Sequence, residues 1–122
     1  MADQADFDPI FARLKPILQD YQAQLNVKTD EPGNYYLNTP FSETYQKYIF
    51  FGAVQIRKNY VSFHLMPVYW YPDLLDGISP ELKKRMQGKS CFNFTSINED
   101  VLAELAELTR RSAERFKENQ FI

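Results

Sequence analysis

Residues 48–66 read YIFFGAVQIRKNYVSFHLM, and this stretch predicts a β-hairpin. Aromatic and β-branched residues, which favour strands, fill both halves of it, and only Arg57-Lys58-Asn59 separates the halves. A two-residue turn at Lys58-Asn59 fits this spacing and sets the pairing of the strands. The predicted pairs are Arg57 with Tyr60, Ile56 with Val61, Gln55 with Ser62, Val54 with Phe63, Ala53 with His64, and Gly52 with Leu65.

The predicted pairing gives the hairpin two faces of different character, because side chains alternate between the faces of a strand. One face is apolar and is expected to pack on the core; it carries Val54, Ile56, Val61, Phe63 and Leu65. The opposite face is mixed in polarity; it carries Gln55 with Ser62, Ala53 with His64, and Phe51 with Met66. Such a face is either covered by another part of the chain or free to bind a ligand or a partner.

Two longer stretches have helical periodicity. In residues 7–25 an apolar stripe recurs at spacings of three and four, with Asp8 as the expected N-cap and Pro9 at the first helical position. Pro16 is expected to kink this helix or to divide it, with a second piece from about Ile17. A final helix is expected to reach about Lys117. Its N-terminus fits a capping box of Ser96 and Glu99, and its apolar face carries Val101, Leu102, Leu105, Leu108, Ser112 and Phe116.

Shorter elements connect these parts. After turn-forming residues at 29–34, residues 35–37 are expected to form at most a short, edge-like strand. Residues 68–71, which follow Pro67, are expected to continue the hairpin as an irregular strand end. A helix of about two turns is then expected, with Ser79 as its cap, Pro80 at its first position and Gly88 as its stop. Residues 89–94 are expected to form the last strand.

The order of elements is therefore helix, strands, short helix, strand and helix, which is typical of the α+β class. We expect a mostly antiparallel sheet of about five strands. The N-terminal and C-terminal helices pack on it, and a short helix precedes the last strand. Neither a linker nor a repeat interrupts the 122 residues, so we expect one domain spanning residues 1–122.

Composition excludes several classes of protein. The 14 Lys and Arg residues nearly balance 16 Asp and Glu residues, so the chain has no field that would attract nucleic acid or an anionic membrane. No apolar run approaches the roughly 20 residues of a membrane span. The first residues are acidic, unlike a signal peptide, and a single cysteine excludes an internal disulfide framework. We expect a cytoplasmic protein with neither nucleic acid nor membrane as partner.

Three segments resemble the YdhG-like domains of unknown function, which are small bacterial α+β domains. They are FGAVQIRKNYVSFHLMPVYWYP at 51–72, the helix that begins Ser-Pro-Glu-Leu at 79–82, and GKSCFNF at 88–94. The resemblance covers the centre and the last helix well and the first 45 residues loosely. It implies the fold more than a function, because the family has no agreed chemistry.

The YdhG-like family is sometimes grouped with frataxin-like iron chaperones, so the resemblance also implies iron binding as an alternative. Iron on such a surface needs several hard oxygen ligands. The candidates are Asp3, Asp6, Asp8 and Asp20, and Arg13 and Lys15 lie among them. This is not a continuous acidic ridge, so we expect no metal site.

His64 and Cys91 are the only histidine and the only cysteine. A catalytic histidine needs a carboxylate to orient it, and the hairpin offers none, so His64 is expected to be a polar residue of a half-covered face. Cys91 lies in an aromatic strand, where a small buried hydrophobic role is more common than a reactive one. A Cys91–His64 pair would require their two strands to be neighbours. We expect no catalytic residue and no cofactor, and an enzyme that uses Cys91 or His64 is the least favoured alternative.

The aromatic run Tyr69-Trp70-Tyr71 cannot point into one core, so part of it is expected to face outward. The basic segments 83–89 and 110–115 either form an anion site together or are solvated helix faces. We interpret the protein as a non-catalytic binding or interaction module. Its partner is an unknown small molecule or protein, a second copy of the chain included. The expected contact residues are Gln55, Tyr60, Ser62, His64 and Trp70.

Overall fold

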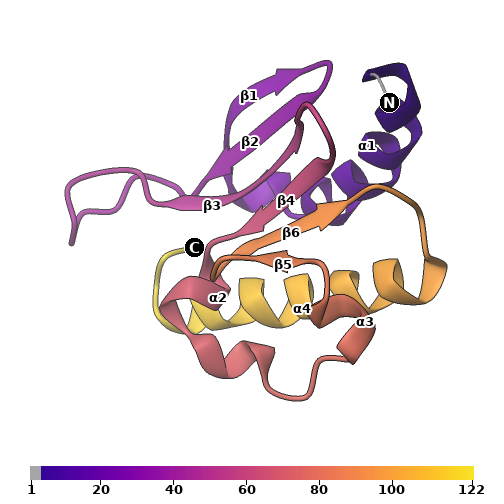
Figure 1. Ribbon diagram of the computed structural model, residues 1–122. Helices are drawn as coiled ribbons and strands as arrows, with labels where there is room; N and C mark the ends of the chain where they lie inside the picture. Colours follow the sequence, from indigo (N-terminus) through magenta and orange to yellow (C-terminus); the bar gives the residue numbers. More distant parts are fainter. Residues whose placement is uncertain (1–3) are drawn as a thin grey trace.

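The computed structural model describes the backbone from residue 4 to residue 122 and the side chains from residue 7 onward (Figure 1). The main elements are α1 (Gln4–Gln19), β1 (Asn26–Glu31), β2 (Asn34–Asn38), β3 (Phe50–Ile56), β4 (Val61–Leu65), β5 (Met86–Gln87), β6 (Cys91–Phe94) and α4 (Glu99–Glu118). Shorter helices are η1 (Gln22–Gln24), α2 (Pro67–Trp70), η2 (Pro72–Leu75) and α3 (Pro80–Lys83). None of the helices in this part of the chain combines the length and the apolar character that crossing a bilayer requires.

The fold is α+β, as predicted, with an antiparallel sheet of six strands in the order β1-β2-β3-β4-β6-β5. The register of the β3–β4 hairpin is confirmed from Gly52 opposite Leu65 to Ile56 opposite Val61. The turn closes as expected, because the Arg57 amide donates a hydrogen bond to the Tyr60 carbonyl at 2.8 Å. Neither β1 nor β5 is predicted as a strand; β1 is polar along most of its length and pairs with β2.

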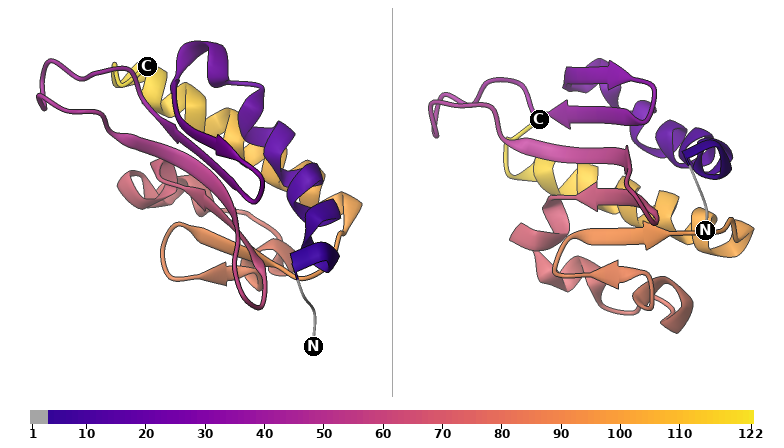
Figure 2. Two further views of the ribbon diagram at one scale, coloured as in Figure 1. Left: turned by 90° about the horizontal axis from the view of Figure 1, so that it is seen from above. Right: turned by 45° about the horizontal axis from the view of Figure 1, so that its top comes forward.

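Both long helices cover the same face of the sheet (Figure 2). Their apolar stripes meet the inward side chains of β2, β3, β4 and β6 in one buried cluster. The predicted stripe of α4 is confirmed, since all six of its positions are buried. In the right view of Figure 2 the strands lie in front of α4, and among the described residues no helix covers the face turned to the reader.

The ends of the long helices differ from the predictions. Asp8 is not an N-cap, because α1 already begins at Gln4. Pro16 does not divide α1, which continues to Gln19. Its ring is exposed while Leu14 and Leu18 are fully buried on either side, so packing offsets the one lost backbone hydrogen bond.

The N-cap of α4 is Asn98 and not Ser96, so the predicted capping box is wrong. The Asn98 side chain accepts hydrogen bonds from the amides of Asp100 and Val101, which satisfies the same orphan donors. Glu99 instead forms an ion pair with Arg13 of α1 at 2.5 Å. Arg13, which is distant in sequence, thus engages the Glu99 carboxylate that the predicted capping box would have used.

Residues 35–37 do not form an edge strand. They belong to β2, which lies between β1 and β3 and buries Tyr35 and Leu37 in the core. Residues 68–71 do not extend the hairpin either. Pro67 occupies the first position of the short helix α2, and the amide of Tyr71 donates to the Pro67 carbonyl at 2.8 Å. Proline lacks the donor that a strand ladder needs but fits a first helical position.

The Ser79 cap is confirmed, since its hydroxyl accepts a hydrogen bond from the Leu82 amide at 3.1 Å. The helix is shorter than predicted, because Met86 and Gln87 form β5 beside β6. Gly88 does not stop a helix but allows the β5–β6 turn, with φ of +79°.

Phe51 is expected on the mixed face from strict alternation, but it is fully buried in the core. The register between β2 and β3 shifts next to it, so Leu37 pairs with Gly52 while Asn38 pairs with Phe50. This bulge turns Phe51 towards Phe116 of α4, with ring centroids 5.9 Å apart. It leaves Phe50 on the uncovered face.

Candidate functional site

The uncovered face of the sheet, which we call the open face, is built from two rows of paired residues. The first row crosses all six strands and consists of Thr29, Tyr36, Ala53, His64, Cys91 and Gln87. The second row consists of Glu31, Asn34, Gln55, Ser62 and Asn93. Because paired residues point to the same side of a sheet, the two rows form one continuous surface.

Aromatic rings cover the centre of the open face. Tyr36 and Phe50 stack with their centroids 4.6 Å apart, and Phe50 meets the His64 ring edge-on at 6.1 Å. Ala53 lies among them and is only 1% exposed, although no helix lies above it. The rings are themselves half-buried, so part of each ring is exposed on the open face.

The polar side chains of the open face are tied to one another. The Gln55 side-chain amide donates to the Asn34 carbonyl oxygen at 3.0 Å, and Arg57 donates to Gln55 in turn at 2.5 Å. Ser62 donates to the Gln55 backbone carbonyl at 3.3 Å. The charged side chains come from the border, and Lys28 of the edge strand β1 lies over the Tyr36 ring, 4.9 Å from its centroid. The central residues Phe50, Ala53 and His64 are uncharged, since burial keeps His64 neutral.

The strands that carry His64 and Cys91 are neighbours, and the two side chains form a pair. Cys91 Sγ lies 3.7 Å from His64 Nε2 and also donates a weak hydrogen bond to Asn93 Oδ1 at 3.4 Å. Burial raises the pKa of the Cys91 thiol and lowers the pKa of His64, and the positive charge of Arg57 lowers the pKa of His64 further. Both groups are thus neutral at pH 7, which is opposite to the thiolate–imidazolium state of a reactive cysteine.

The pKa of His64 is expected to lie below the ordinary value of about 6.5. Between that value and the lowered one, the unfolded chain binds a proton that the folded chain does not, so the free energy of unfolding falls as the pH falls through this window. NMR titration of the single histidine measures the pKa directly. The Arg57→Gln variant should titrate at higher pH, and the His64→Gln variant should lose this part of the pH dependence; a midpoint at or above 6.5 would contradict the prediction.

The structure brings three of the five expected contact residues together, and the other two, Tyr60 and Trp70, lie outside the two rows of the open face. Gln55, Ser62 and His64 share the open face. Tyr60 lies half-buried in the turn before β4. Trp70 lies in α2, where its ring contacts Phe116 and Phe121 at centroid distances of 6.4 and 5.2 Å.

Tyr36, Phe50 and Asn34 belong to the open face but were not among the expected residues. The sequence signal is the alternation in residues 34–38. Because side chains alternate between the two faces of a strand, Tyr36 points away from the face that buries Tyr35 and Leu37. Local sequence does not show which strand this segment pairs with. Phe50 depends in addition on the bulge in β3.

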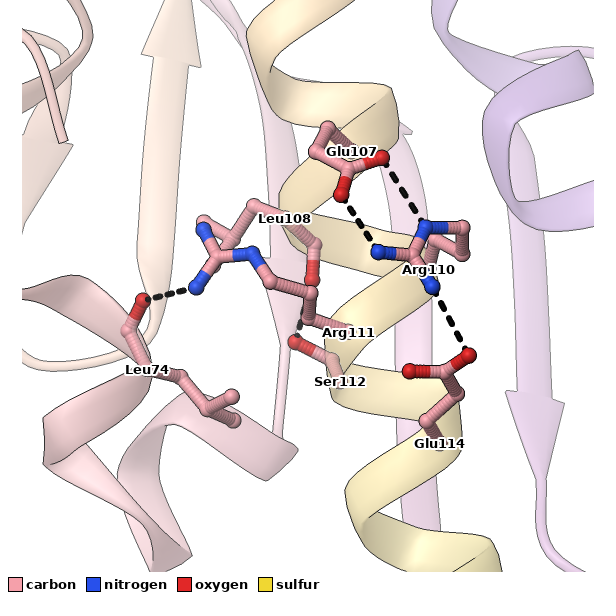
Figure 3. A network of polar contacts seen from close by, with 7 residues as sticks. All are labelled: Leu74, Glu107, Leu108, Arg110, Arg111, Ser112 and Glu114. Carbon is pink, nitrogen blue, oxygen red and sulfur yellow. Dashed lines mark hydrogen bonds and ion pairs between the residues drawn. The ribbon is translucent and has the colours of Figure 1, made fainter.

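The three arginines of α4 are engaged by neighbours. Arg110 pairs with Glu107 and Glu114, which raises the pKa of its guanidinium (Figure 3). Arg111 donates to the Leu74 carbonyl at 3.2 Å, and Arg115 pairs with Asp73 at 2.8 Å. These contacts favour the solvated-face alternative over an anion site.

The acidic residues considered for iron are only partly described. Asp3 and the side chain of Asp6 lie outside the described residues, Asp8 is exposed on α1, and Asp20 is exposed in the turn that follows α1. Among the side chains that are described, no group of three or more His, Cys, Asp and Glu residues could hold a metal ion.

Comparisons with known proteins add no relative to this description. No protein-family model, curated protein or solved structure matches the chain.

Proposed function

We propose that this chain is a non-catalytic interaction module of the YdhG-like type, acting in the bacterial cytoplasm, which binds a protein surface through its open face. One observation carries the proposal: the open face has an uncharged aromatic centre, a charged rim and no helix over it within the described chain. Protein interfaces have this arrangement, with aromatic residues enriched and charges depleted at the centre and polar groups at the border.

The size of the open face indicates the strength of binding. Six strands spaced about 4.8 Å apart, with about five residues each, span roughly 500 Å². Two such faces bury roughly 1,000 Å², which is the lower limit for a specific interface. A weak, reversible complex is therefore expected, and not a permanent one.

The chemistry of the open face supports binding over catalysis. The Cys91 thiol is protonated and His64 is neutral, since burial opposes charge on both. The charged group that shifts the pKa of His64 is Arg57, whereas a catalytic histidine needs a carboxylate beside it. Iron binding is the alternative that the resemblance implies, and no cluster of described side chains favours it.

The occupant to which we commit is a second copy of the chain. The rim carries both signs of charge: Lys28 and Arg57 are positive and Glu31 is negative. Two copies related by a two-fold axis can therefore pair opposite charges. The uncharged centres then meet without desolvating a charge. Sedimentation analysis of the purified protein should show a monomer–dimer equilibrium with a micromolar or weaker dissociation constant.

Cys91 reports on this dimer without any substitution, because it is the only cysteine and lies in the first row of the open face. The rate at which a small disulfide reagent labels it should fall as the protein concentration rises. The Tyr36→Glu variant, which adds a charge at a partly exposed position of the open face, should remain monomeric. The matched Ala103→Glu variant adds the same charge to the exposed side of α4 and should dimerise normally. A monomer at all concentrations, with constant labelling, would rule the proposal out.

A further inference from the structure

A second candidate site lies away from the open face, at the end of the molecule where the β2–β3 loop, α2 and the C-terminal turn meet (Figure 1). Here a cavity of about 410 Å³ is lined by residues 40–45, by Trp70 and Tyr71, and by residues 119–122. This volume lies within the range of small-molecule sites, about 300–1,000 Å³.

Three aromatic rings form the wall of the cavity. Tyr45 and Phe121 are nearly parallel, with centroids 5.7 Å apart, and Trp70 stands at a steep angle to both, at 6.0 Å from Tyr45 and 5.2 Å from Phe121. Tyr45 is 46% exposed and Trp70 is 40% exposed, so part of each side chain is accessible to a ligand. We call these three rings the aromatic corner.

The backbone holds the aromatic corner in an unusual conformation. Gln120 has φ of +65°, and the amides of Gln120 and Phe121 donate to the carbonyls of Lys117 and Phe116, which is a Schellman motif with glutamine where glycine is usual. This turn folds Phe121 back onto Phe116, at a centroid distance of 4.7 Å.

Tyr45 is held by a second strained turn. Its amide donates to the Ser42 hydroxyl at 3.2 Å, and the next residue, Gln46, has φ of +57°. Gln46 and Gln120 are the two residues other than glycine with positive φ in the described chain, and each is adjacent to a ring of the aromatic corner. Residues with strained backbone conformations lower the stability of the fold, and they are found most often at functional sites.

The lining also has a distinctive charge. Glu43 is its single charged side chain, and it contains neither lysine, arginine nor histidine. Aromatic faces carry negative electrostatic potential and attract cations, best of all tryptophan. A neutral or anionic ligand would gain nothing from Glu43, whereas a cation would be attracted by the carboxylate and the rings together.

We propose that this cavity binds a small organic cation of the quaternary-ammonium or methylated-amine class, held against the aromatic corner and balanced by Glu43. Such a cation is weakly hydrated and matches a surface of ring faces, unlike a metal ion, for which the cavity offers a single carboxylate. The site is independent of the open face, so dimerisation can fail while cation binding holds, and the reverse.

Trp70 is the only tryptophan and lines this cavity, so its fluorescence is a direct probe of binding there. Titration with choline should change the emission in a saturable manner. The neutral isostere 3,3-dimethyl-1-butanol, which has the same shape without the charge, should bind about tenfold more weakly. Equal binding of the two compounds would show an apolar pocket and overturn the proposal, as would binding of neither.

Variants separate the two parts of the site, with binding followed by the NMR signal of the choline methyl groups. Trp70→Leu keeps apolar bulk but removes the ring face, and it should weaken binding about tenfold or more. Glu43→Gln should weaken it about threefold. The matched control Glu118→Gln removes a nearby charge outside the lining and should leave affinity unchanged. Equal effects of the two glutamate variants would overturn the role of Glu43.

Discussion

Replacing Phe116 by alanine is expected to lower the free energy of unfolding by about 3–5 kcal/mol. Phe116 is fully buried and joins α4 to the rest of the core. Its ring lies within 6.4 Å of four other aromatic rings, those of Phe51, Trp70, Tyr71 and Phe121. Truncation would leave a cavity that this rigid cluster cannot fill.

Urea denaturation followed by circular dichroism measures the effect of Phe116→Ala. The control is Phe41→Ala, since Phe41 is 45% exposed and its loss should change stability by about 0.5 kcal/mol or less. In the Phe116 variant the Trp70 emission should also shift to longer wavelength, because one wall of its packing is gone. A loss below about 1.5 kcal/mol would mean that the cluster collapses onto the vacancy, contrary to the packing argument.

The second large effect is expected at Gly52, in the middle of β3. A Cβ atom there would lie 2.9 Å from the His64 backbone carbonyl oxygen and 3.1 Å from Leu18 Cδ2 of α1. The nearer atom belongs to the backbone of β4 and cannot rotate away. Gly52→Ala should therefore cost about 1–3 kcal/mol, although alanine is ordinarily the better residue outside tight turns.

Hydrogen exchange distinguishes this mechanism from a general loss of stability. Gly52→Ala should reduce amide protection in α1 and in the β3–β4 pair first, because those are the elements forced apart. Gly77→Ala provides the comparison: its Cβ meets nothing within 4 Å, and its cost arises only from φ of +81°. A neutral or stabilising Gly52→Ala would show that the close contact of α1 and β3 is not tight.

The hairpin shows what local sequence is able to specify. Alternation with a period of two and a two-residue turn leave only one register that buries the apolar face, so every predicted pair from Gly52–Leu65 to Ile56–Val61 is confirmed. The stripe of α4 is specified in the same manner, by a period of 3.6 residues over 20 residues. These patterns repeat often enough to outweigh local irregularities.

The short elements are predicted less well. Few residues contribute to their sequence pattern, so contacts with distant parts of the chain determine their conformation. The polar strand β1 forms only because β2 offers it a partner. Residues 68–71 have strand-forming side chains, yet Pro67 and the packing of α2 on α4 make residues 67–70 helical. The N-cap of α4 is Asn98 and not the predicted Ser96, and Glu99 pairs with Arg13 of α1.

The candidate sites divide in the same manner. The sequence by itself determined the α+β class, the hairpin register and the shared face of Gln55, Ser62 and His64, since all of these follow from periodicity within one stretch of chain. Only the tertiary structure decided that Cys91 lies beside His64 and that Trp70 meets Tyr45 and Phe121. These contacts join residues 25 or more positions apart, and the packing of the whole core selects them, which no local pattern encodes.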